Sequence, residues 1–122
     1  MVQRTDRGDD VARQRGFIDV VDVDNLPPGG LVGVRLEDCD IAVANAEGQF
    51  VAFNDLCLRC GFSLATGSLF GHRLICRGCG WQYDARCGSL FGLPALKLEL
   101  LPVLVHDGHV AVDCRALPRP AR

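Results

Sequence analysis

The amino-acid sequence predicts an all-β domain, either a small β-sandwich or a small barrel. Short runs of β-branched and apolar residues are separated by turn signals, and no segment shows the period of an amphipathic helix. Glu47-Gly48 and Asp107-Gly108 each stand between two such runs and predict two-residue hairpin turns. The 122 residues suffice for one hydrophobic core and are too few for two domains.

The expected strands follow one another along the chain. The turn Pro27-Pro28-Gly29-Gly30 ends the first, and Phe50 and Phe53 bracket β-forming residues in the fourth. The sixth strand leads away from a cysteine-rich loop, and the seventh alternates leucine with Lys97 and Glu99, as a half-buried strand does. The strands are predicted at residues 17–23, 31–36, 40–45, 49–53, 72–75, 81–84, 96–101, 103–105 and 109–112.

The composition indicates one globular domain between two tails. Residues 1–16 carry charges without periodicity and are expected to be a disordered N-terminal tail, and residues 115–122 a C-terminal tail. The domain is expected over residues 17–114, with a metal-binding subdomain at about residues 54–94. The apolar fraction of 48% and the charged fraction of 23% are ordinary for a soluble protein.

Charge and hydropathy exclude several classes of partner. A net charge of −2 gives no electrostatic reason to expect nucleic acid or an anionic membrane surface as a partner. No run of 18 apolar residues is present, and the N-terminal segment lacks the apolar region of a signal peptide. A cytoplasmic location is therefore expected, where thiols stay reduced. The odd number of cysteines, seven, also argues against a fully paired disulfide framework.

Four cysteines in two CxxC pairs are the strongest functional signal. Cys57 and Cys60 form the first pair, Cys76 and Cys79 form the second, and residues 61–75 separate them. Each CxxC turn directs two sulfurs at one point, so the two turns supply four thiolates to one site. Four thiolates favour zinc, a single iron or an iron–sulfur cluster over hard ions such as magnesium.

A glycine follows each pair. Gly61 and Gly80 tolerate the backbone bend that aims N–H groups at sulfur, and such hydrogen bonds disperse thiolate charge. Catalytic signals are weak by comparison, because the sequence has no nucleophile elbow, no phosphate loop and no metal-binding histidine pair beside a carboxylate. Whether the protein is an enzyme is left open, and no catalytic residue is assigned.

From Phe17 to Asp113 the sequence resembles a Rieske-type ferredoxin, that is, a Rieske 2Fe-2S domain. The likeness covers about four-fifths of the chain. The resemblance implies a 2Fe-2S cluster at one end of a β-sandwich, and a protein that passes single electrons. Its motifs are Phe50-Val-Ala-Phe-Asn-Asp-Leu-Cys57, Gly61-Phe-Ser-Leu-Ala-Thr-Gly67, Cys76-Arg-Gly-Cys79-Gly-Trp-Gln-Tyr-Asp84, Arg86-Cys-Gly88, the proline loop Gly92-Leu-Pro94 and the closing hairpin at 103–112.

The sequence departs from the family pattern at both histidines. Rieske loops read Cys-x-His and Cys-x-x-His, with two cysteines on one iron and two histidines on the other. Cys57 and Cys76 match the two family cysteines. Arg59 stands at the first histidine position with Cys60 one residue beyond it, and Cys79 stands at the second. The expected fold is thus a Rieske-like sandwich or barrel with a rubredoxin-like, two-loop metal subdomain.

Three alternatives follow for the site. In the first, a 2Fe-2S cluster has all-thiolate ligation, with Cys57 and Cys76 on the inner iron and Cys60 and Cys79 on the outer. Its potential would fall toward roughly −400 mV, the value of plant-type ferredoxins. In the second, both loops close on one zinc or one iron, as in zinc ribbons and rubredoxins. In the third, the metal has been lost and the cysteines are relics or a disulfide.

Several residues near the loops are weighed as possible contributors. Arg59 could offset thiolate charge or contact a partner, or simply be solvated, and Arg77 is a weaker case. Trp81 and Tyr83 are expected to pack beneath the site. Cys87 could be a spare ligand, although packing as a small residue is favoured. An apolar rim, suited to a redox partner or to excluding water, is expected from Leu58, Phe62, Leu90 and Phe91.

The remaining cysteines and the histidines receive structural interpretations. Cys39 and Cys114 are expected to be buried strand-end residues. His72 is expected to point away from the metal, and His106 and His109 to be solvated hairpin residues. The sequence thus predicts a ferredoxin-like one-electron carrier with a four-cysteine 2Fe-2S site. Family resemblance supplies its partners, a reductase and a terminal oxygenase. The rival is a non-redox binding or regulatory module with structural zinc or a single iron.

Overall fold

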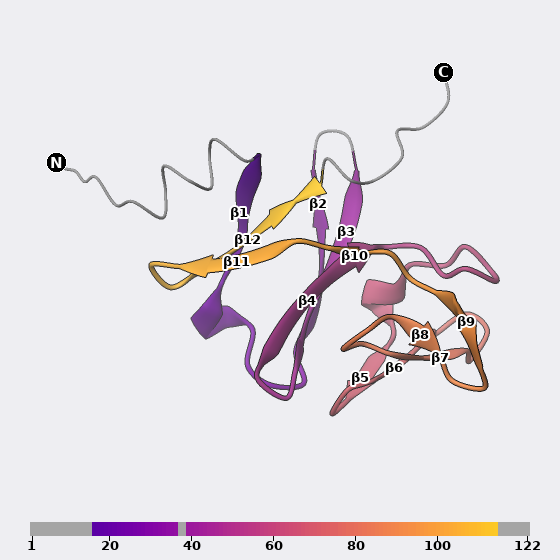
Figure 1. Ribbon diagram of the computed structural model, residues 1–122. Helices are drawn as coiled ribbons and strands as arrows, with labels where there is room; N and C mark the ends of the chain where they lie inside the picture. Colours follow the sequence, from indigo (N-terminus) through magenta and orange to yellow (C-terminus); the bar gives the residue numbers. More distant parts are fainter. Residues whose placement is uncertain (1–15, 37–38, 115–122) are drawn as a thin grey trace, which may run out of the picture.

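The computed structural model describes residues 16–36 and 39–114, and the regular secondary structure of these ranges is almost entirely β-strand (Figure 1). The predicted tails lie outside the described residues, apart from Gly16. The strands of the described ranges form three open antiparallel sheets, which agrees with the predicted sandwich and shows no closed barrel. None of the helical segments in the described chain is long and apolar enough to cross a membrane.

Two of the sheets form the base of the molecule, and their strands agree closely with the sequence prediction. The first has the order β1-β12-β11 and the second β10-β4-β3-β2. The predicted turn at Glu47-Gly48 joins β3 to β4, and the predicted turn at Asp107-Gly108 joins β11 to β12. The bounds are β1 (Phe17–Asp22), β2 (Leu31–Arg35), β3 (Asp40–Ala46), β4 (Gln49–Asn54), β10 (Leu100–Leu101), β11 (Val103–His106) and β12 (His109–Asp113).

The third sheet carries the second cysteine loop and has the order β5-β6-β7-β8-β9. Two of its strands, β5 and β8, are short and were not predicted. The bounds are β5 (Ser68–Phe70), β6 (Arg73–Ile75), β7 (Gln82–Asp84), β8 (Ser89–Leu90) and β9 (Leu93–Lys97). Single 3-10 turns lie at η1 (Val23–Asn25) and η2 (Leu64–Thr66).

The central sheet is buried on both faces, and this places the other two sheets. Side chains alternate along a strand, so Ile41 and Val43 of β3 face one core while the alanines between them face the other. The first core also takes Val110 and Val112 from β12, and the second takes residues of β6, β7 and β8. The alanines facing the second core are Ala42, Ala44 and Ala46.

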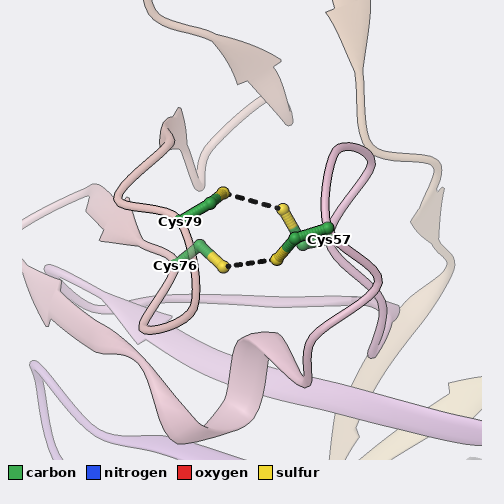
Figure 2. Close-up of side chains that lie close together, drawn as sticks. Cys57, Cys76 and Cys79 are labelled. Atoms are coloured by element: carbon green, nitrogen blue, oxygen red, sulfur yellow. Dashed lines mark hydrogen bonds between the residues drawn. The ribbon is translucent and has the colours of Figure 1, made fainter.

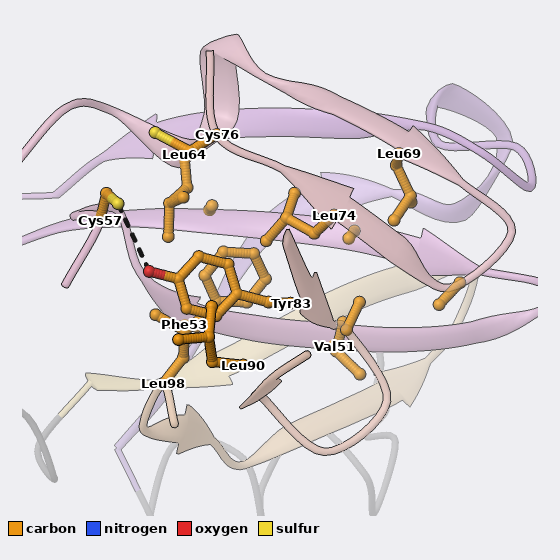
Figure 3. Packing of buried hydrophobic residues seen from close by; sticks show 14 residues of the cluster. Val51, Phe53, Cys57, Leu64, Leu69, Leu74, Cys76, Tyr83, Leu90 and Leu98 are labelled. Atoms are coloured by element: carbon orange, nitrogen blue, oxygen red, sulfur yellow. Dashed lines mark hydrogen bonds between the residues drawn. The ribbon is translucent and has the colours of Figure 1, made fainter. Parts of the chain in front are cut away.

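The second core supports the cysteine loops from below. Tyr83, Phe53 and Leu74 are fully buried in it, and the buried cysteines Cys57 and Cys76 lie at one end of it, on the left in Figure 3. Dense packing of this kind transmits small displacements, so this core fixes where the loops leave the sheet.

One predicted strand was wrong. Residues 96–101 were expected to form a single strand, but the chain leaves β9 at Lys97 and starts β10 at Leu100 in a different sheet. Leu98 between them is buried and its N–H donates to the Gly88 carbonyl at 2.8 Å. The segment does alternate leucine with Lys97 and Glu99, but it connects two sheets and is not one continuous strand.

Candidate metal centre

The two cysteine loops have the same backbone hydrogen bonds. In the first loop the N–H of Cys57 donates to the Phe62 carbonyl at 2.9 Å, and the N–H of Gly61 donates to the Cys57 carbonyl at 3.0 Å. In the second loop Cys76 donates to the Trp81 carbonyl at 2.8 Å, and Gly80 to the Cys76 carbonyl at 3.0 Å. The CxxCG repeat in the sequence therefore produces a repeat in three dimensions.

The glycines of these loops have the backbone conformation that the sequence predicted. Gly61 has φ 75° and Gly80 has φ 80°, a region that residues with a Cβ enter at a cost. Their own N–H groups bond to cysteine carbonyls, however, and the N–H groups near sulfur belong to the residues before them. Each glycine therefore closes its CxxC turn with a backbone hydrogen bond to the first cysteine, and its own N–H is not directed at a sulfur.

The four predicted cysteines come together at one point. The Sγ atoms of Cys57, Cys60, Cys76 and Cys79 all lie within 4.8 Å of one another. The distance is 3.7 Å from Cys57 to Cys79 and 3.6 Å from Cys60 to Cys76. Figure 2 shows Cys57, Cys76 and Cys79 directed toward one another across the gap between the loops.

Burial divides the four cysteines into an inner and an outer pair. Cys57 and Cys76 are buried, Cys79 is half-buried and Cys60 is exposed. The inner sulfurs rest on the second core, and the outer end of the group faces solvent. A metal bound here would be anchored from within and would have one ligand at the molecular surface.

Tyr83 contributes a hydrogen bond that the sequence did not predict. Its ring is fully buried as expected, but its hydroxyl lies 3.3 Å from the Cys57 sulfur (Figure 3). The N–H of Leu58 donates to the same hydroxyl oxygen at 3.1 Å, which leaves the hydroxyl proton for the sulfur. The Gln-Tyr-Asp segment after the second pair was the only sequence signal for this contact.

The buried thiols differ in acidity. Burial opposes ionisation of Cys57, but hydrogen bonds from Tyr83 and from the N–H groups of Cys60 and Arg59 lower its pKa to about 6. Burial, with the neighbouring sulfurs of Cys60 and Cys57, raises the pKa of Cys76 to about 12. Four close thiols resist ionising together, so full deprotonation is favoured when a cation binds and displaces the protons.

The first loop is fixed at its base by Asp55, which the sequence analysis missed. The carboxylate accepts the hydroxyl of Ser63 at 2.7 Å and the N–H of Ala65 at 2.8 Å. These two bonds join the residue before the loop to the residues after it. The sequence signal for this contact was an aspartate two positions before the first CxxC pair together with a serine three positions after that pair.

Gly78 allows the two loops to touch. A Cβ on this residue would lie 2.9 Å from Cβ and Cγ of Phe62 and 3.1 Å from the Cys60 sulfur. Gly78 was not singled out from the sequence, because its φ is unremarkable and only the facing loop requires the missing side chain. The first loop therefore packs directly against the backbone of the second.

Arg59 and Trp81 face each other at the surface of the site. The guanidinium carbon of Arg59 lies 5.8 Å from the centre of the Trp81 ring, within the range of a cation–π contact. Trp81 is half-buried and packs against the second core, which agrees with its predicted structural role. Arg59 thus has a partner, and its side chain is held near the cysteines.

The other cysteines do not join the group. Cys87 is exposed in the turn after β7, where its N–H donates to the Asp84 carbonyl at 3.2 Å. Its predicted place as a small, partly buried residue is therefore wrong, and it is absent from the group of converging sulfurs. Cys39 and Cys114 are half-buried against the first core, near each other, and burial raises the pKa of Cys114 to about 12.

The histidines also lie outside the group. His72 lies 3.6 Å from the carboxylate of Glu47. His109 bonds to Asp22 at 2.7 Å. The side chain of His106 is only 8% exposed and contacts Asp19 at 2.8 Å, so its predicted solvated state is wrong. The hairpin that carries it packs against β1, which the sequence did not reveal.

The predicted apolar rim is present in part. Leu58 and Phe62 of the first loop are exposed. Phe91 is exposed as well, but its ring lies beside His72 and 4.3 Å from the guanidinium carbon of Arg73, so its exposure does not place it in the rim. Leu90 is only 5% exposed and belongs to the second core, so its assignment to the rim was wrong. The alternation along β8 directs Leu90 inward, and the short strand was not recognisable from sequence.

Comparison with known proteins assigns the family. The model of the Rieske [2Fe-2S] domain matches residues 16–105, and the chain belongs to this family. The chain is 27% identical over 104 residues to the ferredoxin component of an alkene monooxygenase system from Xanthobacter autotrophicus, covering 84% of this chain and 85% of that protein. It is also 27% identical over 97 residues to a ferredoxin component of naphthalene 1,2-dioxygenase/salicylate 5-hydroxylase systems from Ralstonia, covering 79% and 93%.

Solved structures agree with this assignment. A complex of reduced oxygenase and oxidized ferredoxin in carbazole 1,9a-dioxygenase contains a chain similar to this one, with a TM-score of 0.73 and 27% identity, covering 81% of this chain and 94% of that one. The ferredoxin of Sphingomonas yanoikuyae B1 has a TM-score of 0.71 and 25% identity, covering 80% and 97%.

The converging side-chain atoms of this chain differ from the ligand atoms of the family's cluster. A Rieske cluster requires two imidazoles on one iron. Within the described residues the converging ligand atoms are four cysteine sulfurs and no histidine nitrogen. The chain therefore keeps the Rieske fold while offering a donor set that does not fit the family's usual cluster.

Proposed function

We propose that this protein is a one-electron carrier in which Cys57, Cys60, Cys76 and Cys79 hold iron. The observation that carries the proposal is the convergence of four cysteine sulfurs within 4.8 Å, in a chain of the Rieske family. Thiolates stabilise ferric as well as ferrous iron, and four protein ligands leave no position open for a substrate. Such a site suits electron transfer better than catalysis.

The proposed partners are the reductase and the terminal oxygenase of an oxygenase system. Two observations support these partners. Relatives of the chain are ferredoxin components of oxygenase systems, and a similar ferredoxin chain has been solved in a complex with its oxygenase. Cys60 is exposed and flanked by the exposed Leu58 and Phe62, so the ligand proposed there would lie at the surface that a partner approaches. We further propose a domain at 17–114, a metal subdomain at about 54–94, and a cytoplasmic location.

A structural zinc site in a binding or regulatory module is the second candidate. One observation favours it: the four sulfurs form a closed set on two short loops with matched hydrogen bonds, an arrangement that zinc also accepts. Zinc has no accessible second oxidation state, so this candidate and the electron carrier make opposite predictions for redox titration.

A redox titration tests the proposal. Protein purified without oxygen from iron-supplemented cells would be titrated with dithionite, and its visible spectrum followed. We expect reversible bleaching that takes up one electron per chain. The reduced protein should then be reoxidised by a terminal oxygenase of this class and reduced again by its reductase. A colourless protein that takes up no electron after reconstitution with iron would reject the electron carrier.

A further inference from the structure

We infer that the four cysteines hold a single metal ion in a tetrahedral set, in place of the two-iron cluster that the family name denotes. The choice of iron as that ion rests on the proposed function, whereas the inference of one ion rests on the geometry of the sulfurs and of the two loops. The inference differs from the all-thiolate 2Fe-2S site that the sequence analysis placed first.

The observed sulfur separations match one tetrahedral ion. At a metal–sulfur distance of about 2.3 Å, the edge of a regular tetrahedron of sulfurs is about 3.8 Å. The two shortest separations are 3.7 Å, for Cys57 with Cys79, and 3.6 Å, for Cys60 with Cys76. The remaining pairs all lie within 4.8 Å. One ion therefore fits with small adjustments of the side chains.

A two-iron cluster needs a longer arrangement. Its irons occupy two tetrahedra that share the edge formed by the bridging sulfides, so cysteines on different irons lie at least about 5.3 Å apart by the same bond length. If Cys57 and Cys76 shared the inner iron, Cys57 and Cys79 would be such a pair, yet they are 3.7 Å apart. Any other assignment of the four cysteines to two irons meets the same difficulty, because every pair of sulfurs lies within 4.8 Å.

The loop backbones set a second limit on the space. Gly78 in the second loop contacts Phe62 and the Cys60 sulfur of the first so closely that even a methyl group would collide with them. Two irons and two sulfides between the loops would require the loops to separate by more than this contact permits. The contact involves backbone and the start of a side chain, which move less easily than the end of a long side chain.

The matched loops fit the same conclusion. Each loop has the bond from the first cysteine N–H to the residue after glycine, and the bond from glycine N–H back to that cysteine. One ion that takes two sulfurs from each of two equivalent turns is bound symmetrically. A Rieske cluster instead distinguishes its two irons by ligand type, and this chain offers one ligand type only.

The test measures metal and sulfide stoichiometry together with electron paramagnetic resonance. Protein isolated without oxygen would be reconstituted with excess ferrous iron and sulfide and then desalted. We expect one iron per chain, no acid-labile sulfide, and a high-spin ferric signal in the oxidised protein that disappears on reduction. Two irons and two sulfides per chain, with a signal that appears only on reduction, would overturn the inference while leaving the electron carrier intact.

The other outcomes also separate the two proposals. One zinc per chain that iron does not replace would support the single-ion site and reject electron transfer. Protein that retains neither iron nor zinc after reconstitution would reject both.

Single substitutions test whether all four sulfurs are ligands. Cys60→Ser and Cys79→Ser should each shift the thiolate-to-iron absorption bands and weaken iron retention against a chelator by at least tenfold. Cys87→Ser is the matched control, because Cys87 is an exposed cysteine outside the group and its loss should leave spectrum and retention unchanged. An unchanged spectrum in Cys60→Ser would overturn the four-sulfur site.

Discussion

The Tyr83 hydroxyl lies between the Cys57 sulfur, at 3.3 Å, and the N–H of Leu58, at 3.1 Å. It therefore joins the second loop, which Tyr83 follows, to the first loop, which contains both of its partners. A hydrogen bond to a ligand sulfur withdraws charge from the metal and favours the reduced state. This contact leads to the first prediction.

Tyr83→Phe should lower the reduction potential of the iron-loaded protein. The ring keeps its buried packing while the hydroxyl is lost, so the effect isolates one hydrogen bond. One such bond is worth about 1 kcal/mol, which for a one-electron couple is on the order of 40 mV. Spectroelectrochemical titration measures the shift. Retention of the wild-type potential would show that the hydroxyl does not act on the sulfur.

Gly78→Ala should force the two loops apart. The added methyl would lie 2.9 Å from Phe62 and 3.1 Å from the Cys60 sulfur, both closer than ordinary contact. Overpacking of this kind costs roughly 1–3 kcal/mol, and the strain falls on the metal ligands. We expect faster metal loss to a chelator and a lower thermal midpoint. Arg77→Ala, at the preceding exposed position, should behave as wild type.

Arg59→Ala should lower the potential by removing a positive charge beside the thiolates. The guanidinium is held over Trp81 at 5.8 Å, so its charge stays near the site. Because the residue is exposed, we expect an effect on the order of 1 kcal/mol, or about 40 mV, that shrinks as salt is added. Arg59→Lys should keep most of the potential. A shift of equal size in the lysine variant would point to the cation–π contact instead.

Asp84→Asn should weaken the fold at neutral pH more than at acid pH. The Asp84 carboxylate accepts hydrogen bonds from the Arg86 side chain at 3.1 and 3.2 Å, and mainly for this reason its pKa is lowered. A lowered folded-state pKa adds stability above the unfolded value, about 3.9, and that stability is lost as pH falls through the folded-state pKa.

The expected difference in unfolding free energy between wild type and Asp84→Asn is largest at neutral pH and shrinks as pH falls through the lowered folded-state pKa of Asp84. Urea unfolding of wild type and variant, both kept metal-free so that acid release of a bound ion does not intervene, measures it at each pH. Arg86→Gln should show the same direction of pH dependence, since it removes the partner of the same carboxylate. A difference that grows on acidification would contradict the assignment.

The turns, strands and cysteine loops of this molecule were predicted from the sequence more accurately than the assignment of strands to sheets. Both hairpin turns and the strands of the two base sheets follow from residue type and period, and the CxxCG repeat predicts two equivalent loops. The strand crossing after Lys97 and the short β5 and β8 depend on which sheet a segment joins. That choice is made by contacts distant in sequence.

The same limit applies within the site. The four converging cysteines were identifiable because their spacing is local to each loop. Tyr83 and Gly78 matter because of what the opposite loop places beside them, at the Cys57 sulfur and at Phe62. Burial of His106 and Leu90 likewise depends on neighbouring strands. The features of the site that the sequence did not predict are therefore those that depend on contacts between segments distant in the sequence.

The strands of the cysteine-bearing sheet, β5 to β9, pair only with one another in the described chain, and this sheet meets the central one through side chains packed on Ala42, Ala44 and Ala46. It can therefore detach as a unit without breaking any ladder of the base. The layer is held by the apolar side chains of the second core, such as Phe53, Leu74 and Tyr83, and a metal bound between the two cysteine loops would add a further link. In metal-free protein, amide hydrogens of β5 to β9 should exchange with solvent well before those of β3 and β12, which would make this sheet a separate unit of local unfolding.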